Sequence, residues 1–327
     1  MKVAPAALKA LVRGIFEKHG MSEAHATLTA DVLVWADLRG MGSHGVMRVP
    51  QYVKFIRQGD LNPRPAMRPA EQGAAFVLLE ADRAAGPIAM MEGARLACEK
   101  ARGAGIGLAV VKSTTHTAAL GYYTQHAARD GFAAIALAAS LPLMAYHGAR
   151  AAGVSTAPLS IAVPGEPEPF ALDMASSMIS MGALAQARRT AKPLPEGVVL
   201  TAEGAPTTDA KHASIPLPLG GAKGSGLGFM FECLASLLAS NPILAESLEK
   251  TPASKHHRQN AMVIAIDIAR FVPPEVFRRE VERLAGDLRQ LPGDEILMPG
   301  ERGARKAAEQ REAVNIADSV YEELKAL

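Results

Sequence analysis

The chain has 327 residues, with 35 Lys and Arg against 33 Asp and Glu, so its formal net charge is +2. Nucleic acid is not an expected partner, because the basic residues are interspersed with acids instead of forming a concentrated positive patch. The two cysteines, Cys98 and Cys233, suggest neither a disulfide framework nor a metal site, and they fit a cytoplasmic protein. The most apolar run, residues 131–145, is too short and interrupted for a membrane span.

The first hundred residues are predicted to be mostly helical. Apolar residues at helical spacing indicate a first helix that ends near residue 18. Ser22 can cap a second helix, which closes near Gly40, and Pro50 and Gly59 bracket a third. The pattern continues with a strand over 74–79 and a helix over 86–102.

From about Gly105 the chain changes to short apolar runs that alternate with turn residues, which is typical of buried strands. A glycine-rich run, 219–227, leads into an apolar helix, and the tail from residue 274 returns to helix. A helix-rich start and finish around a sheet-rich middle predicts an α/β (α+β) fold with a discontinuous first domain. We expect residues 1–104 plus 272–327 to form a helix-rich domain and residues 105–271 a sheet-rich domain.

Several common site motifs are missing. The closest approaches to the Rossmann pattern Gly-x-Gly-x-x-Gly have the wrong final spacing, and Lys223 precedes its glycine instead of following it as in a phosphate-binding loop. There is no Gly-x-Ser-x-Gly elbow of an α/β hydrolase. The pair His256 and His257, flanked by Lys255 and Arg258, could bind a metal, but it is more typical of a solvated basic loop.

The segment 37–58 carries the polar residues that best suit chemistry on a small acid. Ser43, His44, Arg48 and Tyr52 fall within ten residues, and the last three are spaced four apart, so a helical backbone would place them on one face. Arginine binds a carboxylate through two N–H groups, hydroxyl groups orient it, and histidine exchanges a proton near neutral pH. The alternative is a capped helix with a solvated polar face.

A second histidine, His116, follows a predicted strand in the loop Ser-Thr-Thr-His-Thr. Loops at strand ends often carry catalytic groups, and the neighbouring hydroxyl groups could fix the tautomer of the imidazole. The alternative is a helix-capping loop that contains an incidental histidine.

Eight sequence blocks in the same order resemble the malate/L-lactate dehydrogenase family, which is distinct from the Rossmann-type lactate dehydrogenases. Ureidoglycolate dehydrogenase, 2,3-diketogulonate reductase and piperideine-2-carboxylate reductase belong to this family. The blocks are spread over almost the whole chain. They are residues 37–48, 121–123, 147–149, 172–176, 194–197, 206–209, 219–224 and 299–302.

The resemblance implies an NAD(P)-dependent enzyme with a mostly antiparallel cofactor-binding sheet at 105–271 and a substrate and dimerisation domain from both chain ends. It also implies a homodimer, with active sites that draw on the neighbouring subunit. Ser43 and Arg48 match substrate-binding positions, to which we add Tyr52. Family members assign the acid/base role either to the histidine that matches His44 or to the one that matches His116, so both stay candidates.

The cofactor-binding positions that carry over lie in several separate segments. They are Asp173, Met174, Ala175, Lys223, Gly224, Gly300 and Glu301, and we add Ser140. A lysine and closely approaching backbone N–H groups suit a dinucleotide phosphate. Asp173 could instead be a strand-end cap, and the Lys223 loop could be only a tight turn. The sequence leaves the choice between NAD and NADP open.

The chain departs from the family pattern at three places. Thr115 replaces the usual Asn before the second histidine, and Thr117-Ala118 replaces Phe-Gly after it. Ala157 replaces the Asn of a common Thr-Asn-Pro sequence, and Ala183 replaces the Lys of a frequent Gly-Lys pair. The expected function is hydride transfer at C2 of a small 2-hydroxy or 2-oxo acid. The alternatives are reduction of a cyclic imino acid and ligand binding by a degenerate member without catalysis.

Overall fold

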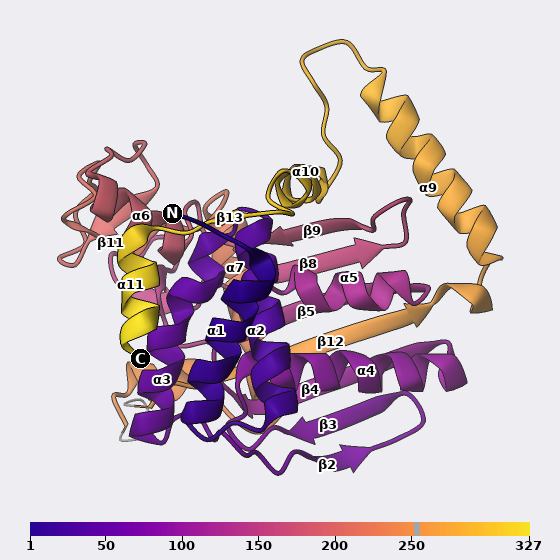
Figure 1. The fold of residues 1–327 in the computed structure, drawn as a ribbon, viewed down its shortest axis with the longest axis horizontal. Coiled ribbons are helices and arrows are strands. Elements are labelled where there is room, and N and C mark those ends of the chain that lie inside the picture. Colours follow the sequence, from indigo (N-terminus) through magenta and orange to yellow (C-terminus); the bar gives the residue numbers. More distant parts are fainter. Residues whose placement is uncertain (252–255) are drawn as a thin grey trace.

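The computed structural model describes residues 1–251 and 256–327. Within them, the main feature is a seven-stranded sheet in the order β2-β3-β4-β12-β5-β8-β9 (Figure 1). Its strands are β2 (Arg68–Gln72), β3 (Phe76–Glu80), β4 (Ile106–Thr114), β5 (Phe132–Ser140), β8 (Leu159–Val163), β9 (Phe170–Met174) and β12 (Gln259–Asp267). Among the described strands, only the β3–β4 pair is parallel, and α4 (Gly86–Ala104) makes its crossover. The mostly antiparallel sheet confirms the expected fold class.

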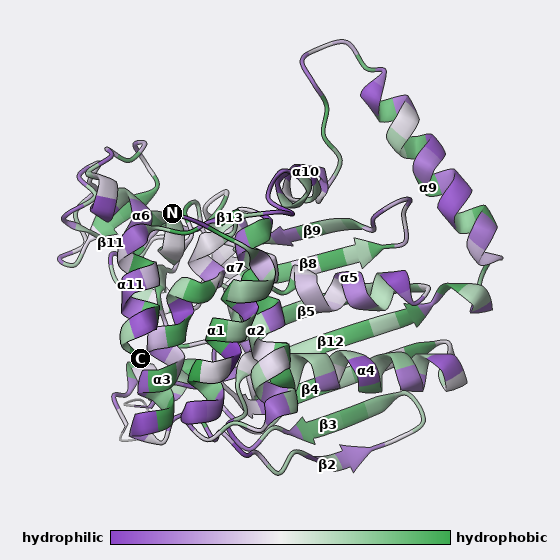
Figure 2. Cartoon of the chain, viewed as in Figure 1, coloured by the Kyte–Doolittle hydropathy of each residue, from purple (hydrophilic) through white to green (hydrophobic). Residues whose placement is uncertain are grey.

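The two faces of the sheet are covered by different helices. On β4, Ala109 and Val111 join a core that contains α4, whereas Val110 faces the opposite core with Phe231. This alternation is the period of two that a strand buried on both faces requires. Figure 2 shows the central strands largely green, which marks their apolar character. The covering elements are α4 and α5 (Gly121–Arg129) on one side, and α7 (Ala222–Phe231) with the π-helical segment η3 (Glu232–Leu237) on the other.

Both ends of the chain contribute to one helical layer beside the sheet (Figure 1). It contains α1 (Pro5–Lys18), α2 (Glu23–Leu38), α3 (Val49–Gln58) and α11 (Asp318–Ala326), and β1 (Lys2–Val3) pairs with β13 (Val314–Asn315). The predicted helix signals are observed: the Ser22 hydroxyl accepts from the His25 backbone N–H at 3.3 Å, and Gly59 ends α3 with φ of 78°. The helical layer therefore draws on both chain ends, whereas β2, β3 and α4, which precede residue 105, belong to the sheet and its covering helices.

The remaining elements lie around this body. They are β6 (Met144–Ala145), β7 (Ala152–Val154), α6 (Met181–Thr190), β10 (Val199–Thr201), β11 (Ala213–Pro216), α8 (Leu244–Leu248), α9 (Pro274–Arg289) and α10 (Glu301–Glu309), with short 3-10 turns η1 (Gly42–His44), η2 (Val46–Arg48) and η5 (Ile268–Arg270). Helix α9 extends away from the sheet, and Ala285 is its one buried residue (Figure 1). Among the residues that the structure describes, none of the helices combines the length and apolar character that a membrane crossing needs.

Candidate active site

One end of the sheet brings together segments that are far apart in the sequence. Gln259, the first residue of β12, lies opposite Thr114 at the end of β4 and Ser140 at the end of β5. Further across the sheet, Leu159 at the start of β8 lies opposite Met174 at the end of β9. The loops that leave this end of the sheet therefore converge, and such loops often carry binding and catalytic groups.

A buried carboxylate fixes the loop that carries Ser43 and His44. Asp37, near the end of α2, accepts a hydrogen bond from the Val46 backbone N–H at 2.7 Å. Burial raises the pKa of Asp37 to about 7, and the hydrogen bond from Val46 opposes this rise. Gly45 must be glycine, because a Cβ there would lie 2.1 Å from the Asp37 carboxylate. The Asp37 carboxyl group is thus a structural clamp for the loop.

Arg48 is held at the start of α3 with part of its guanidinium still free to bind a ligand. Its Nε donates to the Ser43 carbonyl oxygen at 2.7 Å, and its Nη1 donates to Gln51 Oε1 at 2.9 Å. A guanidinium has five N–H donors, so three remain on the two terminal nitrogens after these bonds. The edge of the guanidinium that carries these three donors suits a carboxylate that binds through both of its oxygens.

The hydroxyl group of Tyr52 contacts His116 twice. It lies 2.8 Å from the His116 backbone carbonyl oxygen and 3.0 Å from Nδ1 of the same residue. Because a carbonyl oxygen only accepts, the single hydroxyl proton goes to it, and Nδ1 must then donate its own proton to the hydroxyl oxygen. This tautomer leaves Nε2 of His116 unprotonated and able to act as a base. The hydroxyl thus has a partner that the sequence did not predict.

The two candidate histidines lie side by side. The rings of His44 and His116 are stacked at 5.7 Å between centroids with an interplanar angle of 22°. The Ser43 hydroxyl lies 2.9 Å from Nδ1 of His44. Burial, reinforced by the Arg48 charge, lowers the pKa of His44 to about 4. Burial also lowers the pKa of His116 well below its ordinary value, and repulsion from Arg48, His44 and His257 adds to this effect. Both imidazoles are therefore neutral at pH 7.

A close backbone contact sets the position of the His116 loop. A Cβ on Gly86, the first residue of α4, would lie 2.1 Å from the His116 carbonyl oxygen. On the other side, the Thr117 backbone N–H donates to Gln259 Oε1 at 3.2 Å, and the Tyr123 hydroxyl donates to the Thr117 carbonyl oxygen at 2.8 Å. The loop is therefore held from three different elements.

Gly182 is a site-forming residue whose role the sequence did not reveal. It lies in the first turn of α6, and a Cβ there would lie 1.7 Å from the Cβ of Ser43. The α6 segment therefore seats directly on the loop that carries Ser43. A Gly-Ala pair alone does not indicate such a contact, because the partner is about 140 residues away in the sequence.

Most of the predicted cofactor residues lie at the same end of the sheet. Asp173 and Met174 are the last two residues of β9. Oδ2 of Asp173 accepts a hydrogen bond of 2.8 Å from the backbone N–H of Gly121, the first residue of α5. Burial raises the pKa of Asp173 to about 6, and the hydrogen bond from Gly121 opposes the rise. The loop before α7 docks here too, because the Leu219 backbone N–H donates to the Ser176 carbonyl oxygen at 2.9 Å, next to Ala175.

The glycines of this loop let the backbone approach closely. Gly220 and Gly221 have φ of 59° and 63°, a region that favours glycine. A Cβ on Gly224 would lie 2.4 Å from the Ser176 carbonyl oxygen. Lys223 is exposed in the first turn of α7. A lysine beside helix N–H groups suits an anion such as a phosphate.

Gly300 and Glu301, at the start of α10, lie beside Ala171 of β9, away from the strand end that carries Asp173 and Met174. The carbonyl oxygen of Pro299 accepts from the Ala171 backbone N–H at 3.0 Å, and Gly300 has φ of 92°. Both residues line a cavity of about 180 Å³, together with Phe170 of β9. No contact joins these two residues to His44 or His116 in the described part of the chain. Ser140, by contrast, is buried at the sheet end where the loops converge.

The expectation of a solvated loop at the histidine pair is wrong for His257. His256 is exposed and its Nδ1 lies 2.7 Å from Asp60 Oδ1, as expected for a surface residue. The His257 ring, however, stacks on Phe55 at 4.3 Å between centroids and 13° between planes. The physical reason is that α3 offers an aromatic surface beside this segment, which local sequence cannot show. Lys255, which flanks the pair, lies outside the described residues.

The structure combines a mostly antiparallel sheet, a chain without a dinucleotide fingerprint, and an arginine beside two neutral histidines, which is compatible with a dehydrogenase of a type distinct from the Rossmann enzymes. The chain belongs to the family described as malate/L-lactate dehydrogenase, which matches residues 3–325. This membership confirms the resemblance seen in the sequence blocks. It also confirms the expected class of enzyme, a dehydrogenase or reductase.

The similar proteins include enzymes with several different names. The chain is 32% identical to L-sulfolactate dehydrogenase of Methanocaldococcus jannaschii, over 97% of this chain and 93% of the relative. It is 31% identical to ureidoglycolate dehydrogenase (NAD(+)) of Escherichia coli K12, over 99% and 95%. It is also 31% identical to the Δ1-pyrroline-2-carboxylate/Δ1-piperideine-2-carboxylate reductase of Pseudomonas putida, over 98% and 95%.

Solved structures agree over the full length of the chain. The sulfolactate dehydrogenase from M. jannaschii superposes with a TM-score of 0.88 at 30% identity, covering 100% of this chain and 96% of that one. Malate dehydrogenase from Entamoeba histolytica superposes with a TM-score of 0.93 at 26% identity, covering 100% and 96%. The roles of individual site residues and the domain limits stay predictions.

Proposed function

We propose that this protein catalyses reversible hydride transfer between NAD(P)H and C2 of a small 2-oxo acid. The observation that carries the proposal is the tautomer of His116, whose Tyr52 partner leaves Nε2 as a base, close enough to Arg48 for the two side chains to interact electrostatically. Relatives named for malate, sulfolactate and ureidoglycolate, which are all 2-hydroxy acids, support this substrate class.

In the proposed mechanism, each protein group has one task. The terminal N–H groups of Arg48 bind the C1 carboxylate and orient C2. As a hydride leaves C2 of the 2-hydroxy acid, Nε2 of His116 accepts the hydroxyl proton, and in reduction the protonated imidazole returns it. Tyr52 holds His116 in this tautomer. Ser43 holds His44, which lines the same space and is the second candidate for the proton transfer.

The residues present fit a dinucleotide, which supplies or accepts the hydride when bound. The backbone of the loop before α7 approaches Ser176 so closely that only glycine fits at Gly224, and Lys223 places a cation beside it. We assign the cofactor contacts to these two residues and to Ser140, Asp173, Met174, Ala175, Gly300 and Glu301. The choice of NAD or NADP is an outcome of the assay below.

The substrate panel that tests this function contains 2-oxo acids, ureidoglycolate and cyclic imino acids. Each is assayed at 340 nm with NADH or NADPH, or with the oxidised cofactor for the hydroxy acids. We expect turnover of at least one 2-oxo acid. Turnover of cyclic imines alone would move the protein to the second candidate function, which the Pseudomonas putida relative supports. No turnover, and no thermal stabilisation by either cofactor, would overturn the proposal.

We further propose a cytoplasmic homodimer in which the helix-rich domain, residues 1–104 plus 272–327, and the outer side of α7 and η3 in the sheet-rich domain both contact the neighbouring subunit. Large apolar side chains on the outer side of α7 and η3 support association of two copies. Phe229, Met230, Leu237 and Leu238 are each 50% to 59% exposed. Light scattering should give twice the chain mass, and Leu238→Glu should reduce it. A wild-type monomer at micromolar concentration would contradict this assembly.

A further inference from the structure

His257 is held on the same helix face as the two groups that the proposed mechanism uses. Arg48 is the N-cap residue of α3 and has helical backbone angles, and Tyr52 and Phe55 follow it on the helix at spacings of four and three, so the three share one face. Arg48 is the carboxylate-binding group, Tyr52 holds His116, and Phe55 stacks on His257. The three functional groups are therefore arranged along α3 in the order Arg48, His116, His257.

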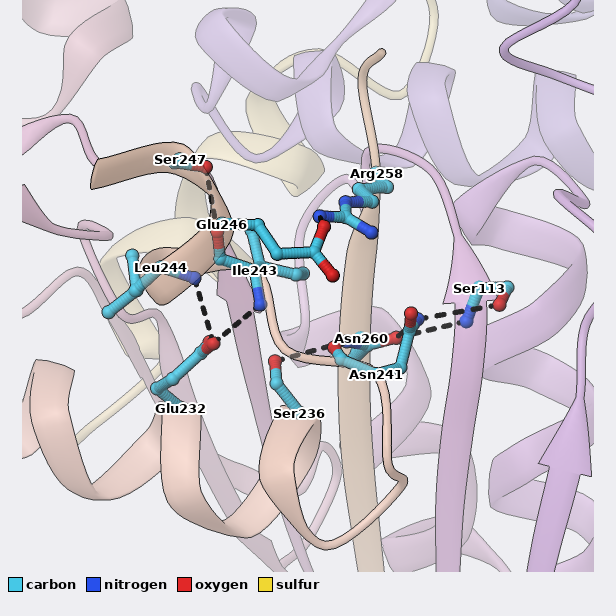
Figure 3. A network of polar contacts seen from close by, with 10 residues as sticks. All are labelled: Ser113, Glu232, Ser236, Asn241, Ile243, Leu244, Glu246, Ser247, Arg258 and Asn260. Carbon is cyan, nitrogen blue, oxygen red and sulfur yellow. Dashed lines mark hydrogen bonds and ion pairs between the residues drawn. The ribbon is translucent and has the colours of Figure 1, made fainter. Parts of the chain in front are cut away.

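Two sets of contacts fix the segment that carries His257. On one side, Asp60 follows α3, and its Oδ2 accepts from the His257 backbone N–H at 3.2 Å. On the other side, Arg258 forms an ion pair with Glu246, and Asn260 bonds to the network around Asn241 (Figure 3). The ring is thus placed by its surroundings and is not a freely moving surface side chain.

The Nε2 atom of His257 is buried and has no hydrogen-bond partner among the described residues. Buried polar side-chain atoms nearly always have a partner, so an unpartnered nitrogen next to a binding site points to a ligand. Burial and repulsion from Arg48, opposed by Asp60, lower the pKa of His257 to about 4. The ring is therefore neutral at pH 7, and in the tautomer that is protonated at Nε2 it can donate one hydrogen bond from this atom without adding charge.

We infer that His257 is a specificity-determining residue whose Nε2 hydrogen-bonds the polar group that the substrate carries beyond C2. The inference rests on the proposed function and follows the order of groups along α3. Arg48 takes the C1 carboxylate, His116 takes the oxygen on C2, and His257 lies next in line. The substrate class is then a 2-hydroxy or 2-oxo acid with a carboxylate, sulfonate or amide oxygen beyond C2.

A matched pair of substrates separates this role from a structural one. L-Malate differs from L-lactate by a second carboxylate, which is attached to the carbon that is the methyl group of lactate. The oxidation of both substrates is followed at 340 nm. Wild type should prefer malate, because lactate leaves the buried nitrogen unpaired. His257→Phe keeps a ring against Phe55 but removes the nitrogen. It should lower kcat/KM for malate about tenfold to hundredfold, mainly through KM, and leave lactate within about twofold.

His257→Gln replaces the N–H donor and should restore part of the preference for malate. His212→Phe makes the same chemical change at an exposed histidine and should change neither substrate. Three results would overturn the role of His257 and leave the oxidoreductase function standing. They are an equal loss of kcat/KM on both substrates in His257→Phe, a wild type without preference for malate, and a wild type that is active on cyclic imines alone. A wild type that turns over no substrate of the panel and is thermally stabilised by neither cofactor would overturn the proposed function and this inference together.

Discussion

Tyr52 donates its hydroxyl proton to the backbone carbonyl oxygen of His116, and the same hydroxyl accepts from Nδ1 of that residue's ring. Backbone and side chain of His116 are thus held by one fully buried phenol. This contact distinguishes His116 from His44, whose Nδ1 meets a serine hydroxyl that can either donate or accept.

Replacing Tyr52 with Phe tests this positioning directly. The ring shape is kept, but the His116 carbonyl oxygen and Nδ1 lose their partner, so kcat should fall about tenfold to hundredfold. The substitution His116→Ala should lower kcat about a hundredfold to ten-thousandfold, because it removes the proposed acid/base group. In the His116→Ala background, Tyr52→Phe should have little further effect. Additive losses in the double variant would contradict a shared role.

The low pKa values of the two histidines predict the acid limit of hydroxy-acid oxidation. The kcat/KM profile reports the free enzyme, in which burial and the Arg48 charge keep the imidazoles neutral. Its acidic limb should therefore have a midpoint below pH 6. Arg48→Gln removes the repelling charge, so the limb should move to higher pH while KM rises. A wild-type midpoint near 6.5 would contradict the desolvated site.

Asp37 predicts a fall in stability as the pH rises. Its ordinary pKa is 3.8, and burial raises it to about 7 in the folded protein. The stability contributed by the protonated carboxyl is therefore full below pH 3.8 and is lost as the pH rises through 7. Asp37→Asn retains an acceptor for Val46 and does not titrate.

Urea unfolding of wild type and Asp37→Asn between pH 5 and pH 8 measures this effect. Relative to the variant, wild type should lose on the order of 1–3 kcal/mol across this range. Asp318→Asn, at a side chain that is 83% exposed, is the control and should run parallel to wild type. Parallel curves for Asp37→Asn would mean that the Asp37 pKa is not raised.

Two of the departures from the family pattern fall where the backbone is strained. Ala118 has φ of 53° and Ala157 has φ of 37°, in the left-handed region that disfavours residues with a Cβ. The family commonly has Gly and Asn at these positions, which are residue types that tolerate this conformation. The site of this chain therefore retains a backbone shape for which its own residues are poorly suited.

Ala118→Gly should consequently stabilise the protein. Relief of left-handed strain, about 1–2 kcal/mol, exceeds the loss of one buried methyl group, about 0.8 kcal/mol, so a gain of up to about 1 kcal/mol is expected. Ala119→Gly is the matched control, because Ala119 is equally buried but is not among the residues with positive φ. It should destabilise by about 1 kcal/mol. If urea unfolding shows that both substitutions lower the free energy of unfolding equally, the backbone at Ala118 is not strained.

The parts of the site that the sequence predicted are those carried by local patterns. Ser43, His44 and Arg48 were found because they lie within six residues, and the helix ends were found because Ser22 and Gly59 have local capping roles. The order of the sheet, by contrast, depends on pairings between segments up to about 160 residues apart, such as β4 with β12. Only the family resemblance indicated a mostly antiparallel sheet.

The contacts that could not be predicted join residues distant in the sequence. Tyr52 and His116 are 64 residues apart, and His257 was placed in a solvated loop because its neighbours are basic. Its actual position depends on Phe55 and Asp60, about 200 residues earlier. Gly182 likewise has no local signal, since its meaning lies in the side chain of Ser43.

The hydrogen bonds of Gln310 have a consequence for synthesis of the chain. Its side-chain amide donates to the carbonyl oxygens of Asp37 and Leu38, and its Oε1 accepts from the Asn315 backbone N–H. The end of α2, whose Asp37 carboxyl group holds the loop that carries His44, therefore gains these contacts only after residue 310 has been synthesised. Nascent chains that stop before Gln310 lack this support, so the loop that carries His44 is held by fewer contacts until that residue has left the exit tunnel.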